Sequence, residues 1–230
     1  MTNEYIFEGH NCEILPEDYK TTDFSFKIIL IGNSGVGKTS ITFKATKNIF
    51  NSKYNATVGF EFSTFIVKID DSIIKLQIWD TCGQEIYRGL ISNFYRSSSL
   101  AIIVYSIDNR RSFDEIDDWI KELKINSKPD AKIFLIGNKK DLENERKVEF
   151  NEGEKIKDFY QFDYFNETSA KNGINTKELF IKAALLLCED YKRYSVVNGP
   201  KEKSSSLISL TLSNDNAKIV KKKNKKKKCC

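Results

Sequence analysis

A glycine-rich octet, Gly32–Thr39, combines the residue types that bind a polyphosphate. It reads GNSGVGKT and fits the pattern G-x-x-x-x-G-K-[ST] between an apolar run, KIILI, and a helical stretch. Glycines let backbone N–H groups approach an anion without a side-chain clash, and the following helix directs its unpaired N–H groups and positive dipole end at the same place. We expect Lys38 to bridge the β- and γ-phosphates and the Thr39 hydroxyl to bind Mg²⁺. A glycine-rich turn without a ligand is the alternative interpretation.

The loop residues that we expect to contact the nucleotide are Asn33, Ser34, Gly35, Val36, Gly37, Lys38, Thr39 and Ser40.

A second segment, QIWDTCGQE, begins where another apolar run ends. Asp80 is placed to reach Mg²⁺ through water, and Gly83 offers an N–H to a γ-phosphate. Gln84 is the candidate catalytic residue, because its side chain could orient an attacking water. The D-x-x-G pattern is weak by itself and gains meaning only beside the glycine-rich octet.

Two further segments indicate which base is bound. Asn138, Lys139 and Asp141 belong to NKKD, and the aspartate can accept hydrogen bonds from N1–H and the N2 amino group of guanine. Adenine lacks that donor pair, so it would leave buried polar groups unpaired. ETSAK follows the last apolar run, and its residues Ser169, Ala170 and Lys171 are expected to brace the base, chiefly through the Ala170 N–H. A solvated charged turn is the alternative interpretation of NKKD.

These segments need a scaffold of alternating strands and helices. Short apolar runs read KIILIG, FEFSTFIVKI, IIKLQIW, LAIIVYSI, KIFLIG and DYFNE, and amphipathic stretches such as RSFDEIDDWIKELKI and NTKELFIKAALLLCEDYKRY lie between the later ones. This alternation predicts an α/β fold with a six-stranded, mostly parallel sheet and about five helices. A hairpin turn at Lys68–Ile73 predicts one antiparallel edge strand. All the motifs then face the carboxyl ends of the strands, where α/β proteins bind ligands.

The composition divides the 230 residues into three parts. Residues 1–25 are polar and acidic and are expected to form a flexible extension, with a short docking turn at EYIF or CEIL. Residues 26–194 carry the strand and helix patterns. Residues 195–230 predict a disordered tail. Eight lysines lie within residues 218–230, so the net charge of +5 is a property of the tail and argues against a basic, nucleic-acid-binding face.

Cysteine and histidine usage narrows the chemistry. Five scattered cysteines and no apolar signal segment favour a reduced, intracellular protein. His10 is the only histidine, which makes serine–histidine catalysis and a histidine-built metal site improbable. The apolar run Leu100–Tyr105 is too short to span a bilayer.

Residues 26–194 resemble a Ras-superfamily small GTPase and, more narrowly, a member of the Rab family. The motifs that carry the resemblance, besides those above, are TVGFEF, KLQIWDT, FYRSS, IVYSID and the terminal pair Cys229 and Cys230. The resemblance implies a protein that binds and slowly hydrolyses GTP to GDP, with Mg²⁺, as a monomeric switch in vesicle traffic. It implies no nucleic-acid partner.

The resemblance also implies roles for residues that no separate pattern marks. Thr57 matches the switch I threonine that binds Mg²⁺ when the γ-phosphate is present, and Phe50 matches the aromatic residue that packs against guanine. Phe62, Trp79 and Phe94 match the aromatic triad that meets effectors; core packing is the alternative for these three. The full set expected to bind effectors is Val58, Gly59, Phe60, Glu61, Phe62, Trp79 and Phe94.

The tail resembles the Rab ending that receives two geranylgeranyl groups on Cys229 and Cys230. Two lipid chains give stable anchoring where one is marginal, and the neighbouring lysines favour an anionic leaflet. A solubilising charge run and a nuclear address are the alternatives. The implied partners are an exchange factor, a GTPase-activating protein, effectors, an escort protein with its prenyltransferase and a dissociation inhibitor. The implied location is the cytoplasmic face of an intracellular membrane, with a soluble cytosolic pool in the GDP form.

Some residues depart from the Rab pattern. Cys82 replaces a usual alanine beside Gly83, Ile86-Tyr87 is atypical, and Ser106 replaces a common aspartate. None of them is expected at a phosphate, metal or base contact, so they affect the choice of partner and the turnover.

Two other functions stay open at this point: a P-loop ATPase or small-molecule kinase, and a nucleotide-locked scaffold with little hydrolysis.

Overall fold

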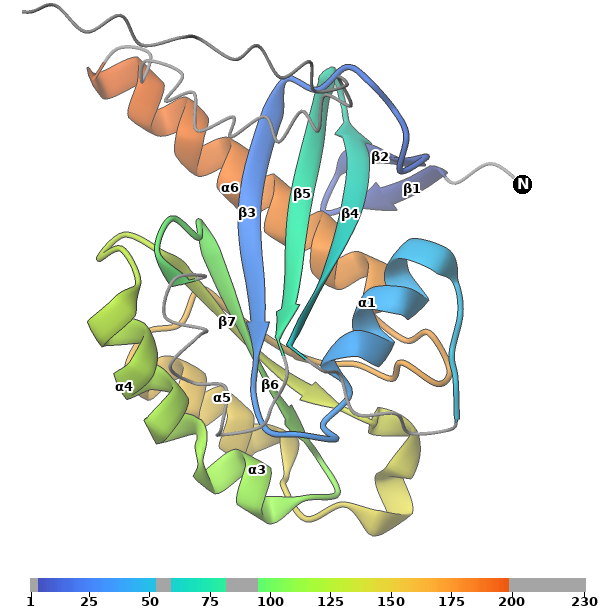
Figure 1. Cartoon of the computed structure of the whole chain (residues 1–230), viewed down its shortest axis with the longest axis vertical. Helices are drawn as coiled ribbons and strands as arrows, with labels where there is room; N and C mark the ends of the chain where they lie inside the picture. The colour runs from blue at the N-terminus through green and yellow to red at the C-terminus, as the bar shows by residue number, and fades with distance from the viewer. Residues whose placement is uncertain (1–3, 53–58, 82–94, 199–230) are drawn as a thin grey trace, which may run out of the picture.

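The computed structural model describes residues 4–52, 59–81 and 95–198. One mixed sheet runs through this part of the chain in the order β1-β2-β4-β5-β3-β6-β7-β8 (Figure 1). The strands are β1 (Glu4–Phe7), β2 (His10–Leu15), β3 (Phe24–Ile31), β4 (Phe60–Ile69), β5 (Ser72–Thr81), β6 (Leu100–Ser106), β7 (Lys132–Asn138) and β8 (Tyr164–Glu167). The helices are α1 (Lys38–Lys47), α3 (Arg110–Asp114), α4 (Ile116–Asn126), α5 (Phe150–Tyr160) and α6 (Thr176–Asn198), with a 3₁₀ helix at Lys140–Glu145.

The centre of the sheet is parallel, as the alternation of apolar runs and helices predicts. Strand β3 pairs in parallel with β5 and β6, β6 with β7, and β7 with β8. Every residue of β6, LAIIVYS, is buried, which is typical of a strand that is covered on both faces. Strand β4 runs antiparallel to β5 across the expected turn. The α/β class, the mostly parallel sheet and its antiparallel edge are therefore confirmed.

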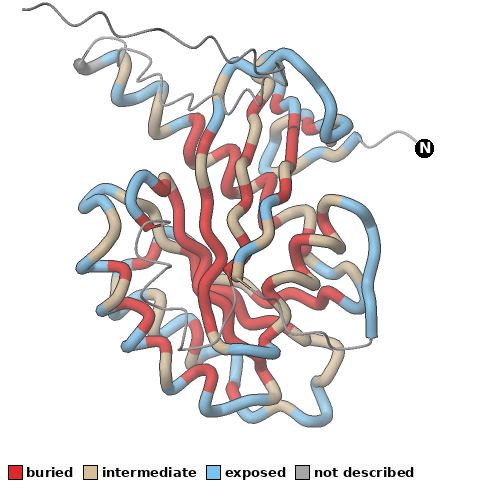
Figure 2. The backbone as a smooth tube through the Cα atoms, in the orientation of Figure 1, coloured by how far each residue is buried: buried red, intermediate tan, exposed pale blue. Residues whose placement is uncertain are grey.

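Alternate residues of β3 enter different cores, because successive side chains of a strand point to opposite faces. Ile28 and Leu30 pack in one apolar cluster, with residues of α1 and α6. Ile29 and Ile31 pack in the other, which contains the buried face of α4 and Phe162, just after α5. Figure 2 shows the buried residues concentrated on the central strands and on the inward sides of the helices. The two cores hold the carboxyl ends of β3, β6 and β7 in fixed relation.

The expectation of a flexible extension over residues 1–25 is wrong for residues 4–15, which form two additional strands. Strands β1 and β2 make a hairpin around Glu8 and Gly9, whose φ angles of 49° and 85° suit a two-residue turn. Strand β2 continues the sheet by pairing Cys12 with Ile69 and Leu15 with Ile66.

The hairpin packs on the core because its side chains alternate between the core and the outside. Tyr5, Phe7 and Ile14 pack against the core, and Cys12 is 2% exposed. Lys182 of α6 pairs with Glu8, and Lys177 donates to the Tyr5 hydroxyl at 2.9 Å. The sheet accordingly has eight strands in the described part of the chain instead of the six expected.

The amphipathic stretch expected over residues 111–125 is divided at Glu115, where α3 ends and α4 begins.

Among the helices of residues 4–52, 59–81 and 95–198, none is both long enough and apolar enough to cross a membrane.

Candidate functional site

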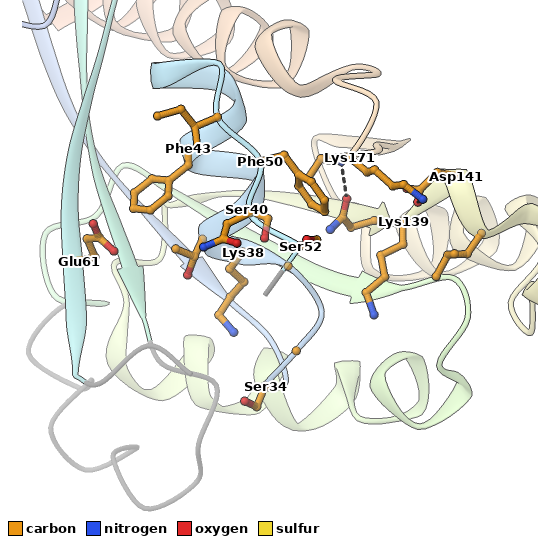
Figure 3. A pocket seen from close by; sticks show the side chains of 18 of the residues that line it. Ser34, Lys38, Ser40, Phe43, Phe50, Ser52, Glu61, Lys139, Asp141 and Lys171 are labelled. Atoms are coloured by element: carbon orange, nitrogen blue, oxygen red, sulfur yellow. Dashed lines mark hydrogen bonds and ion pairs between the residues drawn. The ribbon is translucent and has the colours of Figure 1, made fainter. Parts of the chain in front are cut away.

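A cavity of about 620 Å³ opens at the carboxyl ends of the parallel strands. Figure 3 shows Glu61 of β4 at one end of it, Lys38 in the middle and Asp141 toward the other end. The structure brings twelve of the expected nucleotide-binding residues to its wall: Ser34, Gly35, Gly37, Lys38, Thr39, Ser40, Phe50, Asn138, Lys139, Asp141, Ala170 and Lys171.

The glycine-rich octet forms a tight loop between β3 and α1, and two of its glycines are required by their surroundings. Gly32 has a φ of 136°, and a Cβ there would lie 2.1 Å from the carbonyl oxygen of Val104. Gly37 has a φ of 100°, and a Cβ there would lie 2.3 Å from Nδ2 of Asn138. Side chains at either position would push the loop away from the sheet.

The loop presents positive charge and helix N–H groups to the cavity. Lys38 is 6% exposed, and its ammonium donates to the carbonyl oxygens of Gly32 at 2.7 Å and Asn33 at 2.9 Å. The first turn of α1 carries no acidic residue. An anion at this end of α1 would therefore meet the helix dipole and Lys38, without a carboxylate from the helix's own first turn.

Thr39 and Asp80 form a hard-oxygen pair beside the loop. The Thr39 hydroxyl donates to Oδ2 of Asp80, which is 1% exposed, and Oδ1 of Asp80 has no hydrogen-bond partner among the described residues. Burial raises the pKa of Asp80 to about 6, although the Thr39 hydroxyl and the Lys38 charge favour the ionised form.

The pair fits Mg²⁺, which prefers oxygen ligands and is usually held by one or two protein groups together with water and phosphate. A cage made entirely of protein side chains does not fit. Within residues 4–52, 59–81 and 95–198, no three His, Cys, Asp or Glu side chains gather to hold a metal ion.

At the opposite end of the cavity, Asp141 is held by the ETSAK loop. Oδ1 of Asp141 accepts a 2.6 Å hydrogen bond from the Ser169 hydroxyl, which in turn accepts one from the Asn172 N–H at 3.1 Å. Lys171 lies 3.8 Å from Oδ2 of Asp141. These contacts fix the carboxylate while leaving its remaining lone pairs for a ligand with adjacent donors.

Asn138 connects the two ends of the site. Its Nδ2 donates to the Val36 carbonyl at 2.8 Å, and its Oδ1 accepts from the Thr168 hydroxyl at 3.1 Å and the Ala170 N–H at 3.3 Å. The side chain is almost fully buried, since Asn138 is 1% exposed. One amide thus joins the glycine-rich loop, the end of β7 and the ETSAK loop.

Four expected nucleotide-binding residues lie just behind the cavity wall. Val36 contributes its carbonyl to Asn138, and Ser169 contributes its hydroxyl to Asp141. Asp80 lies behind Thr39. The Asn33 side chain points away from the cavity, toward Glu115 and Trp119 of the α3–α4 segment.

Several predicted positions lie outside the described residues. They are Thr57 and Gly83, expected to bind nucleotide, Gln84, expected to be catalytic, Val58 and Phe94, expected to bind effectors, the atypical Cys82, Ile86 and Tyr87, and Cys229 and Cys230, expected to carry lipid.

The described part of the effector set divides between two environments. Phe60 and Phe62 of β4 are 51% and 49% exposed, and their rings lie 5.4 and 5.3 Å from that of Trp79. Large apolar rings exposed to this extent are available for a partner. Glu61, between them, faces the opposite way and lines the cavity.

Sequence reasoning missed some cavity residues, namely Phe43, Ile49, Asn51, Ser52, Thr81 and Leu142. Asn51 and Ser52 directly follow Phe50, and Leu142 directly follows Asp141, so adjacency to a motif was the available signal. Phe43 lies one helical turn after Thr39 and could have been found from that spacing.

Comparison with known proteins agrees with this geometry. The family model of the Ras family matches residues 27–189. The chain is 41% identical over 167 residues to "Ras-related protein Rab-3A" of Homo sapiens, covering 73% of this chain and 76% of that protein. It is 42% identical to "Ras-related protein Rab-3D" of Homo sapiens with the same coverage, and 41% identical to "Ras-related protein Rab-8A" of Pongo abelii over 72% of this chain and 79% of that protein.

Proposed function

This chain belongs to the Ras family of small GTPases, on its Rab branch, and on that premise we propose that it acts as a membrane-anchored GTP switch in vesicle traffic. Small GTPases are GTP hydrolases, so the reaction converts GTP to GDP and phosphate.

The observation that carries the proposal is the Asn138 side chain, which joins the glycine-rich loop to the loop that holds Asp141. A phosphate-binding loop alone suits many nucleotides. A carboxylate fixed by Ser169 at the far end of the same cavity suits a base with two neighbouring donors, which guanine has and adenine lacks.

In the proposed complex, Lys38 and the loop N–H groups neutralise the β- and γ-phosphates. The Thr39 hydroxyl and the Asp80 carboxylate hold Mg²⁺, which when bound neutralises charge that develops on the phosphates. Phe50 packs against the base. Thr57 and Gly83 contact the γ-phosphate, so its loss on hydrolysis releases both switch segments.

Hydrolysis is proposed to be slow without a partner. Gln84 orients the attacking water, and no arginine lines the cavity among the described residues. An arginine supplied by an activating protein would raise the rate by roughly 10³–10⁵-fold. A slow intrinsic rate lets the GTP state persist long enough for effectors to bind at Phe62, Trp79 and Phe94.

Membrane attachment is proposed through the tail. Cys229 and Cys230 would carry geranylgeranyl groups, added with an escort protein and removed from the bilayer by a dissociation inhibitor. The eight lysines within residues 218–230 add attraction to an anionic leaflet. The test is pelleting with membranes from cells that express the full chain or a Cys229→Ser/Cys230→Ser variant. Equal pelleting of the two would refute this anchor.

The switch itself is tested by single-turnover hydrolysis of GTP. The wild-type chain should hydrolyse bound GTP slowly by itself and much faster with an activating protein. Gln84→Leu should hydrolyse little GTP whether or not the activating protein is present. If both chains were equally inert in all conditions, the nucleotide-locked scaffold would be the better account.

A further inference from the structure

The side chain of Asn33, the second residue of the glycine-rich loop, is held by two residues more than 80 positions away. Its Nδ2 donates to Oε2 of Glu115 at 2.6 Å, and its Oδ1 accepts from the indole Nε1–H of Trp119 at 2.9 Å. Both ends of the amide are engaged, so its orientation is fixed. We call Asn33, Glu115 and Trp119 the loop clamp.

The two partners of Asn33 are themselves firmly placed. Trp119 is 2% exposed and packs in the core between the sheet and α4. Glu115 lies at the break between α3 and α4, and its other carboxylate oxygen pairs with Arg111 at 2.5 Å. The side chain of Glu115 is 22% exposed, whereas that of Arg111 is 77% exposed, so the carboxylate is the more constrained of the two.

The clamp acts on the same loop residue that contacts Lys38. The carbonyl oxygen of Asn33 accepts a 2.9 Å hydrogen bond from the Lys38 ammonium. Gly32, immediately before it, is pressed against the backbone of Val104, and Ser34, immediately after it, lines the cavity. Fixing the Asn33 side chain therefore limits the freedom of the backbone on which Lys38 and the cavity wall depend.

We propose that Glu115, through Asn33, is a positioning residue for nucleotide retention, although it does not line the cavity. The inference rests on the proposed function, because it names what holds the phosphate-binding loop in place. The clamp pre-orders the loop, so that binding a nucleotide restricts fewer loop conformations and release is slower.

The chemistry of the clamp allows a charge-exchange test with GDP bearing a fluorescent group. Asn33→Asp puts a carboxylate where the amide nitrogen lies 2.6 Å from Glu115. The repulsion should release GDP about tenfold faster, equivalent to about 1.4 kcal/mol. Glu115→Gln keeps an acceptor oxygen for Asn33 and should change the release rate by no more than about twofold.

The double variant Asn33→Asp/Glu115→Gln restores a donor opposite a carboxylate. It should return release to within about threefold of wild type. Asp118→Asn is the matched control, because it removes an acidic charge from the first turn of α4 at an exposed position that pairs with Lys121. It should release GDP at the wild-type rate. Thermal unfolding with saturating GDP checks that each variant is folded.

A lack of rescue would overturn the inference. If wild type retains GDP but the double variant releases it as fast as Asn33→Asp, the contact does not position the loop. If wild type retains no GDP, the proposed function and the inference fall together. Should Asn33→Asp fail to fold, Trp119→Phe removes the indole donor to the same amide, together with one ring of the buried side chain, and should still speed release. Unchanged release would again overturn the inference.

Discussion

The Nδ2 atom of Asn138 lies 2.8 Å from the carbonyl oxygen of Val36, 102 residues earlier in the chain, and donates a hydrogen bond to it. The contact is possible because Gly37 has no side chain: a Cβ there would lie 2.3 Å from the same nitrogen. The glycine-rich loop and the NKKD motif thus share one buried amide, that of Asn138. The site is a single unit for this reason, and its phosphate end and base end should respond together to mutation.

Replacing Asn138 by alanine should weaken nucleotide binding as a whole. The change leaves the Val36 carbonyl and the Ala170 N–H without their partner. The loss of a buried hydrogen-bonded group costs about 1–3 kcal/mol, so GDP should dissociate about 5- to 150-fold faster. Asn126→Ala, which removes a hydrogen bond to Glu122 at the end of α4, is the control and should not change dissociation. Equal dissociation from both variants would contradict the linking role.

Asp141→Asn should change which base is preferred. The new amide has only one acceptor oxygen, so it can no longer accept from both N1–H and the N2 amino group of guanine. Xanthine has a carbonyl in place of that amino group, and this carbonyl can accept a hydrogen bond from the NH₂ of the new amide. Ser169 should hold the new side chain as it holds the old one. Competition between xanthosine and guanosine diphosphates measures the preference. A variant that still selects guanosine diphosphate would show that Asp141 does not read the base.

Removal of Mg²⁺ should release nucleotide from the wild-type chain faster. Thr39→Asn removes the hydroxyl that contacts Asp80. Loss of a group at a metal site lowers metal affinity at least about tenfold. The variant should therefore release GDP quickly with or without a chelator. Thr46→Ala, which removes a hydroxyl that donates to the Thr42 carbonyl further along α1, is the comparison and should keep its response to the chelator. A chelator response in Thr39→Asn equal to that of wild type would exclude Thr39 from the metal site.

The amino-terminal hairpin should contribute to stability. Cys12 is 2% exposed between β1 and β4, so Cys12→Asp buries a carboxyl group and should lower the free energy of unfolding by about 2–4 kcal/mol. Glu13→Asp places the same side chain at the next, exposed position and should change it by less than about 0.5 kcal/mol. Urea unfolding with saturating GDP gives both values. Equal stability of the two variants would mean that the hairpin does not pack as described.

The sequence predicts the parallel centre of the sheet well, because apolar runs such as β6 can be buried on both faces only in such a sheet. It also brings Lys38, Thr39, Asp80 and Asp141 to one edge, since each lies at or beyond the carboxyl end of a strand. The hairpin could not be predicted in the same way. Its strands have four and six residues, and Glu8 at its turn finds its partner, Lys182, on α6, 174 positions away.

Contacts between distant side chains account for the other differences. Glu61 was expected at the effector surface, but alternation along β4 turns it to the cavity while Phe60 and Phe62 face out. Asn33 was expected to contact the nucleotide, and its side chain instead bonds to Glu115 and Trp119. No local pattern indicates that its side chain is taken by Glu115 and Trp119, because that depends on how α4 packs on the sheet.

The central claim, that Lys38 and its loop bind phosphates while Asp141 selects guanine, is tested most directly by competition between GTP and ATP for the purified chain in Mg²⁺. We predict that GTP displaces a fluorescent guanine nucleotide at concentrations at which ATP has no effect. Equal displacement by ATP, or a chain that binds neither nucleotide, would contradict the account.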